Sequence, residues 1–179
     1  MTYDEELCDA LHCAEERFGP RLSNKDAFPS IVFHDGPPQV YFPTGSRIEI
    51  RLPLKCEFDD FAARYHLRHE AVHLLSPVLR REITTLEEGI AELFARDYLR
   101  ANFDYDDEIP PPADHRYAGA LTLAERFLTP RPDAIVRLRA HEPVISRITT
   151  ELIQRTYPEV PTSLSFPLAT PFYALSTVA

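Results

Sequence analysis

The stretch FDDFAARYHLRHEAVHLLS, residues 58–76, carries the pattern on which the expected fold depends. Its apolar and histidine positions recur every three or four residues, which predicts an α-helix. These positions form two stripes on different sides of that helix. A helix that is apolar on most of its sides is packed by the rest of the chain. We therefore expect a central helix here, ended by Pro77.

The residues before this helix predict one further helix and a small sheet. Apolar positions at helical spacing cover residues 4–18, and Gly19-Pro20 stops them. Three short β-prone runs follow, and the last of them alternates apolar and charged residues, as a half-buried strand does. We expect strands at residues 30–33, 40–42 and 48–52, with the last two joined as a hairpin.

The residues after the central helix predict a mainly helical second half. Thr84-Thr85 is a suitable start for a helix that runs to about Ala101. An acidic, proline-containing connection, residues 104–112, comes next. Further helices are expected at residues 113–128, 133–139 and 142–157, with an irregular, proline-rich tail from about 158. The expected fold class is α+β, in one domain that covers residues 1–179.

Composition narrows the classes of function. The chain is 44% hydrophobic and 26% charged, which is typical of soluble globular proteins. A net charge of −9 without a basic patch argues against a nucleic-acid partner, and no apolar run reaches the ~20 residues of a membrane span. The N-terminus is acidic where a signal peptide is basic. Three cysteines without CxxC spacing indicate free thiols in the cytoplasm, although a Cys8–Cys13 bridge remains an alternative. The oligomeric state does not follow from these features.

Two histidines in the central helix predict a metal site. His69 and His73 are four residues apart, so on a helix they project from one face about one turn, ~6 Å, apart. That separation suits two imidazoles on one tetrahedral zinc ion. Glu70 points beside the metal position, where a general base takes a proton from the water that zinc binds.

The next helix supplies a third ligand. Glu88 and Glu92 are again four residues apart, so they share a face. We assign Glu88 to the metal and expect Glu92 to accept the free ring N–H of His69 or His73, which fixes the orientation of that ring. Gly89 weakens a helix, so we expect a packing reason for it, a close approach of two helices.

The motifs His69-Glu70-x-x-His73 and Glu88-Gly89-Ile90-Ala91-Glu92 resemble those of the gluzincin metallopeptidases. The resemblance covers roughly residues 40–100 and implies a zincin-like fold, in which a small sheet precedes the HExxH helix and the glutamate helix. It also implies zinc held by two histidines and a glutamate, with the glutamate of HExxH as the base. A peptide substrate would then add as a strand to the sheet edge, at residues 40–42 or 48–52.

The group that stabilises the oxyanion in such a site is less determined by the sequence. Candidates are His115, Tyr117, His141 and Tyr157, and His141 is favoured because His141-Glu142-Pro143 resembles the His-Pro element of some gluzincins. His66, one turn before the first zinc ligand, is expected to support the site rather than to bind the metal.

Two functions of different classes follow. The first is a zinc-dependent peptidase that hydrolyses peptide bonds in a peptide or protein substrate. The second is a catalytically silent regulatory or protein-binding module that retains the fold and the zinc site. In either case the tail or the acidic connection is a candidate cover for the cleft.

Overall fold

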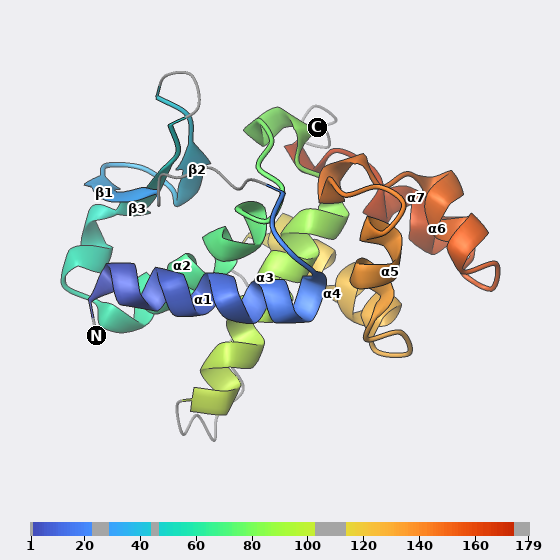
Figure 1. Ribbon diagram of the computed structural model, residues 1–179, viewed down its shortest axis with the longest axis horizontal. Coiled ribbons are helices and arrows are strands. Elements are labelled where there is room, and N and C mark those ends of the chain that lie inside the picture. Colours follow the sequence, from blue (N-terminus) through green and yellow to red (C-terminus); the bar gives the residue numbers. More distant parts are fainter. Residues whose placement is uncertain (1, 23–28, 44–46, 103–113, 174–179) are drawn as a thin grey trace.

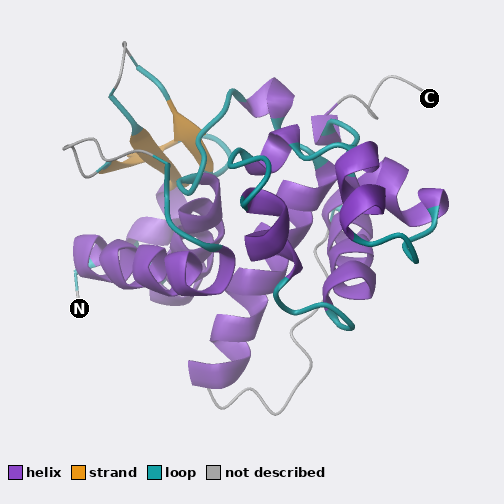
Figure 2. Cartoon of the chain, turned by 45° about the vertical axis from the view of Figure 1, so that its right-hand side comes forward, coloured by secondary structure: helices purple, strands orange, loops and turns teal. Residues whose placement is uncertain are grey.

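The structure is a computed structural model that describes residues 2–22, 29–43, 47–102 and 114–173. The expected acidic connection at residues 104–112 lies outside these ranges. The described residues form seven α-helices and one three-stranded sheet, which confirms the α+β class. The sheet lies at one end of the helical body, beside the helices α1 and α2 (Figures 1 and 2).

Two helices from the first half of the chain pack against each other. Helix α1, Tyr3–Phe18, begins with a capping box in which Thr2 accepts from the backbone of Glu5 and Glu5 accepts from that of Thr2. Helix α2, Asp60–His73, begins after the Asp59 side chain, which accepts a hydrogen bond from the backbone of Ala62. It is therefore shorter than residues 58–76. Every residue of α2 from Leu67 to His73 is buried, which confirms its central position.

The sheet contains all three expected strands, two of them joined as the expected hairpin. Strands β2, Gln39–Tyr41, and β3, Glu49–Pro53, pair antiparallel with Val40 opposite Ile50. Strand β1, Ser30–His34, pairs parallel with the other side of β3, so the order is β1-β3-β2. Residues 48–52 therefore belong to the central strand. The expectation that they offer a free edge is wrong, and β2 is the edge strand that lies against α2.

Helix α3, Thr85–Asn102, follows a short turn, and Thr84 accepts from the backbone of Glu87 at its start. Its first three turns, residues 85–96, are buried throughout. The remaining elements are helices α4, His115–Leu128, α5, Ala134–Arg139, α6, Thr150–Thr156, and α7, Thr162–Leu168, and the 3₁₀ turns η1, Leu54–Glu57, η2, Arg80–Glu82, and η3, Ile145–Arg147. No helix among the described residues has both the length and the apolar character that a membrane span requires.

Two expectations for the second half are corrected. The helix expected at 142–157 begins only with α6, because the Thr149 side chain accepts from the backbone of Leu152 and so caps the helix there. The tail after Pro158 is not irregular throughout. It forms α7, in which Leu164 and Leu168, four residues apart, make one buried face. All three cysteines are free thiols, so no Cys8–Cys13 bridge is present.

Gly89 lies where α3 crosses α4. A Cβ atom placed on Gly89 would lie 2.4 Å from the carbonyl oxygen of Ala120 and 2.8 Å from Cβ of Ala124. The expected packing reason is thus present, with α4 as the close neighbour. We expect Gly89→Ala to push the two helices apart and to lower the free energy of unfolding by about 1–3 kcal/mol, measured by urea denaturation.

Gly119 is the matched control for this prediction. It also lies inside a helix, α4, but a Cβ atom there would meet no atom within 4 Å. Gly119→Ala is expected to raise stability by about 0.5–1 kcal/mol, because alanine loses less backbone entropy on folding. Equal effects of the two substitutions would contradict the close approach at Gly89.

A buried ion pair joins α1 to α2. Arg68 is fully buried and donates from Nε and Nη2 to Oε1 of Glu6, at 3.0 and 2.8 Å. The Glu6 side chain is only 2% exposed. Arg68 also donates to Asp9 and stacks on the ring of Tyr98, with Cζ 3.6 Å from the ring centroid. Arg68 directly precedes His69, so this network fixes the part of α2 that carries the candidate ligand His69.

Candidate metal centre

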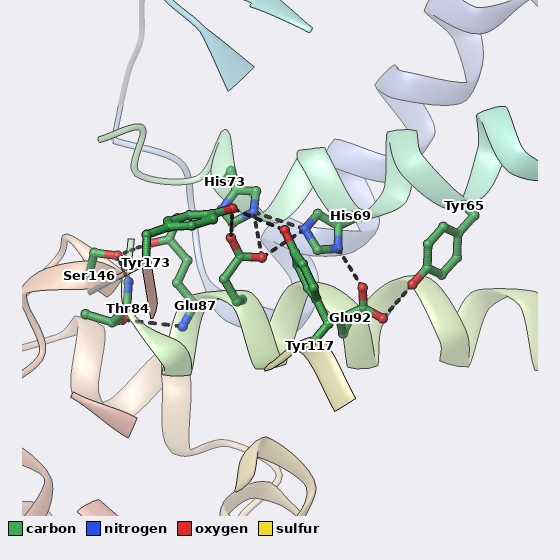
Figure 3. A network of polar contacts seen from close by, with 10 residues as sticks. Tyr65, His69, His73, Thr84, Glu87, Glu92, Tyr117, Ser146 and Tyr173 are labelled. Carbon is green, nitrogen blue, oxygen red and sulfur yellow. Dashed lines mark hydrogen bonds and ion pairs between the residues drawn. The ribbon is translucent and has the colours of Figure 1, made fainter. Parts of the chain in front are cut away.

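Three donor atoms from α2 and α3 converge at one point. They belong to His69, His73 and Glu88, which are all buried, and they lie within 4.8 Å of one another. The Nε2 atoms of the two histidines are 3.2 Å apart. Oε2 of Glu88 lies 3.2 Å from Nε2 of His69 and 3.8 Å from Nε2 of His73. Figure 3 shows the rings of His69 and His73 above α3.

The dimensions of this triangle fit a tetrahedral zinc site. With zinc–ligand bonds of about 2.0–2.1 Å, two ligands of a tetrahedron are about 3.3 Å apart. The three measured edges, 3.2, 3.2 and 3.8 Å, lie within about half an ångström of that separation. In addition, Oε2 of Glu88 is buried and accepts no hydrogen bond from a described donor. The residues present thus match the ligand types, number and spacing of a zinc site with three protein ligands.

A carboxylate behind His73 sets the tautomer of its ring. Oε1 of Glu87 lies 2.8 Å from Nδ1 of His73, so Nδ1–H donates to it and Nε2 is the nitrogen that faces the other two candidate ligands. The second oxygen of Glu87 accepts from the hydroxyl of Ser146. This role of Glu87 was not predicted from the sequence. Its position directly before Glu88 in the first turn of α3 is the only local signal.

Glu92 lies on the Nδ1 side of His69, where it was expected. Its Oε1 is 3.6 Å from that nitrogen, which is longer than a hydrogen bond. Its Oε2 accepts from the hydroxyl of Tyr65, one turn before His69 on α2. Burial together with the charge of Glu92 raises the pKa of Tyr65, so this hydroxyl keeps its proton. The pair Tyr65–Glu92 therefore borders His69, whereas Glu87 holds His73.

Glu70 is buried beside the three candidate ligands, and its pKa is raised above the usual value of a glutamate. Burial raises its pKa, against the effects of His73, His69 and a hydrogen bond from the backbone N–H of Val40. Its Oε2 atom is buried and has no hydrogen-bond partner among the described residues. One oxygen of the Glu70 carboxylate thus accepts a hydrogen bond from the edge strand β2, and the other has no described partner and can accept a proton.

The two histidines are surrounded by carboxylates. Burial alone would lower the pKa of His73, but the hydrogen bond to Glu87 and the charge of Glu88 outweigh it and raise the pKa to about 10. The pKa of His69 is raised in the same way, with Glu88 as the main partner. His66, which is less enclosed by acidic groups, has its pKa lowered to about 3 by burial and by His69, so its ring is neutral.

A cavity of about 410 Å³ opens onto these residues. Its walls are formed by residues 37–40, the last two of which belong to β2, and by the second half of α2. The loop that leads to α3 and the start of α4 complete them. A volume of this size is typical of ligand-binding sites. The ligand triangle and Glu70 lie on its wall, so a bound molecule can reach them.

The structure separates the four candidates for an oxyanion partner. His141, which the sequence favoured, is exposed in the turn after α5 and does not line the cavity. His115 is 95% exposed, and Tyr157 packs on Phe127. Only Tyr117 lines the cavity, with its ring centroid 6.3 Å from that of His69. The His-Glu-Pro sequence could not reveal this, because the direction of α5 depends on long-range packing.

A second tyrosine, Tyr173, enters the site from the far end of the chain. Its hydroxyl lies 3.0 Å from Oε1 of Glu88 and 3.1 Å from the hydroxyl of Tyr117. Burial and the charge of Glu88 raise the pKa of Tyr173 to about 12, so it is protonated at neutral pH. The sequence analysis assigned no role to this residue, which lies 85 positions after Glu88.

Comparison of the chain with protein-family models, with curated proteins and with solved structures finds no match. The resemblance to gluzincins thus remains limited to the motifs at residues 69–73 and 88–92. The case for a function depends on the side-chain geometry of the site.

Proposed function

We propose that the chain is a zinc-dependent metallopeptidase with a zincin-like arrangement of sheet, HExxH helix and glutamate helix. The observation that carries the proposal is the triangle of His69, His73 and Glu88 donor atoms, with the buried carboxylate of Glu70 beside it. Zinc is the metal that this mixture of two imidazoles and one carboxylate in tetrahedral spacing favours.

A zinc ion held there supplies Lewis acidity, which polarises a carbonyl group and lowers the pKa of a water molecule. Glu70 is placed to act as the general base. Its unpartnered Oε2 atom takes the proton of the attacking water and then passes it to the leaving amine. Burial raises the pKa of Glu70, which makes its carboxylate a stronger base than an exposed glutamate.

The substrate we propose is an extended segment of a peptide or protein. Strand β2 is the sheet edge that borders the cavity, and Gln39 and Val40 of β2 line it. A peptide added along this edge would pass its carbonyl groups over Glu70, whose carboxylate is already bound by Val40. The three free cysteines support a reducing compartment, the cytoplasm, as the place of action.

The test is a zinc titration of the metal-free chain followed by incubation with a mixed peptide library. We expect one zinc per chain and cleavage that stops when a chelator removes the metal. The affinity for zinc should rise between pH 6.5 and 10, because the proton on His73, with its pKa near 10, must leave before the ring binds the metal. A chain that takes up no zinc, or a loaded chain that cleaves no peptide, would contradict the proposal.

A further inference from the structure

Residues 170–173, which we call the C-terminal strap, are bound to the start of α3. The backbone N–H of Thr85 donates to the carbonyl of Thr170 at 2.9 Å, and the N–H of Phe172 donates to the carbonyl of Ile83 at 2.8 Å. Between them, Pro171 pairs with Thr84 as an isolated β-bridge. These bonds fix the strap to the same helix start that carries Glu87 and Glu88.

The strap directs Tyr173 at the metal ligand Glu88. Figure 3 shows the ring of Tyr173 beside His73, and its hydroxyl lies 3.0 Å from Oε1 of Glu88. The ring packs edge-on against Phe172, with centroids 5.0 Å apart, and lies under the guanidinium of Arg80, whose Cζ is 4.5 Å from its centroid. These contacts with Phe172 and Arg80 hold the ring, and with it the hydroxyl, in place.

The hydrogen bonds at this hydroxyl have only one consistent direction. Arg80 bonds to the hydroxyl oxygen, and a guanidinium only donates. An ionised carboxylate only accepts, so the hydroxyl of Tyr173 donates its one proton to Oε1 of Glu88. The hydroxyl of Tyr117, 3.1 Å away, must then donate to the oxygen of Tyr173.

The two oxygens of Glu88 therefore have different surroundings. Oε1 accepts from Tyr173 at 3.0 Å, whereas Oε2 accepts from no described donor and lies 3.2 Å from Nε2 of His69. A carboxylate with one oxygen already bound presents the other to a metal, and its side chain has less freedom to rotate.

We propose that Tyr173 is a positioning residue for the metal centre: its hydroxyl engages Oε1 of Glu88, so that Oε2 alone is the ligand and the C-terminal strap completes the site. The inference rests on the metal centre proposed above. It gives the last described residue of the chain a role in metal affinity, through a bond that the motifs at 69–73 and 88–92 do not contain.

The test compares Tyr173→Phe with the unaltered chain. Phenylalanine keeps the ring contacts with Phe172 and Arg80 and removes only the hydroxyl. We expect zinc affinity, measured by competition with a chromophoric chelator, to fall by about 10- to 100-fold. The visible absorption of the Co²⁺-loaded chain should also change, because Glu88 is then free to bind through both oxygens. A purely structural role would not alter that spectrum in a folded chain.

Tyr157→Phe is the matched control. The Tyr157 hydroxyl is buried and has no hydrogen-bond partner among the described residues, and it does not line the cavity. Its removal should change neither zinc affinity nor the Co²⁺ spectrum. Tyr117→Phe, which removes one donor to Tyr173 and leaves the strap intact, should weaken zinc binding by less than Tyr173→Phe does.

The outcomes separate this inference from the proposed function. If the unaltered chain binds zinc and both tyrosine variants of the site bind it equally well with the same Co²⁺ spectrum, the positioning role is overturned and the metallopeptidase proposal stands. If the unaltered chain binds no zinc, both are overturned. Weaker binding and an altered spectrum in Tyr173→Phe, with thermal unfolding unchanged, would support the role.

Discussion

Glu70→Gln is expected to lower kcat for peptide cleavage by about 10²- to 10⁴-fold while one zinc per chain stays bound. The carboxamide has nearly the same shape as the carboxylate, and its oxygen still accepts from the N–H of Val40. It has no atom that takes a proton from water at neutral pH. The loss therefore falls on the chemical step, and the ligands His69, His73 and Glu88 are untouched.

The measurement is kcat on a peptide that the unaltered chain cleaves, with zinc content determined on the same samples. Glu16→Gln on α1, whose side chain is 68% exposed, is the control and should keep full activity. The same pair decides between the peptidase and a catalytically silent module. A silent module would show no cleavage before the change and unaltered zinc and partner binding after it.

Arg68→Met is expected to lower the free energy of unfolding by about 3–5 kcal/mol, a large part of the stability of a chain of this size. Methionine fills most of the space of the arginine stem but removes both hydrogen bonds to Oε1 of Glu6, whose side chain is only 2% exposed. The buried carboxylate keeps only the ion pair of its Oε2 with Arg64, at 3.5 Å, so the lost hydrogen bonds to a buried charge are the main cost. Urea denaturation monitored by circular dichroism gives the value.

A double variant identifies the cause. Arg68→Met combined with Glu6→Leu removes both charges of the pair, and it should recover most of the stability lost in the single variant. Asp9, whose side chain is 52% exposed, remains solvated in both variants. A single variant that loses less than about 1 kcal/mol would show that the pair adds little to the joint between α1 and α2.

The parts of the fold that depend on local signals were predictable from the sequence. The spacing of apolar residues in α2 and the threonine cap of α3 act within one or two turns, so the pattern alone locates these helices. The positions of His69, His73 and Glu88 on facing helices follow from the same periodicity, once the two helices are known to be neighbours.

The parts that depend on long-range contacts were not predictable. The parallel pairing of β1 with β3 makes β3 central, and nothing within either strand indicates it. Glu87 contacts His73 only because α3 packs on α2 with the Glu87 side chain turned toward the His73 ring. That rotation of α3 about its own axis is set by long-range packing. Backbone hydrogen bonds from the C-terminal strap to Ile83 and Thr85 bring Tyr173 to the site. No sequence pattern near Tyr173 predicts these bonds.

The position of the C-terminal strap in the sequence also affects the order in which the parts of the site are synthesised. During synthesis the chain leaves the ribosome N-terminus first, so His69, His73 and Glu88 emerge well before residue 173. During that interval Glu88 lacks the hydrogen bond that holds one of its oxygens. If His69, His73 and Glu88 form the proposed metal site, a nascent chain would carry it without Tyr173, and the site would be complete only after nearly all of the described protein has been synthesised.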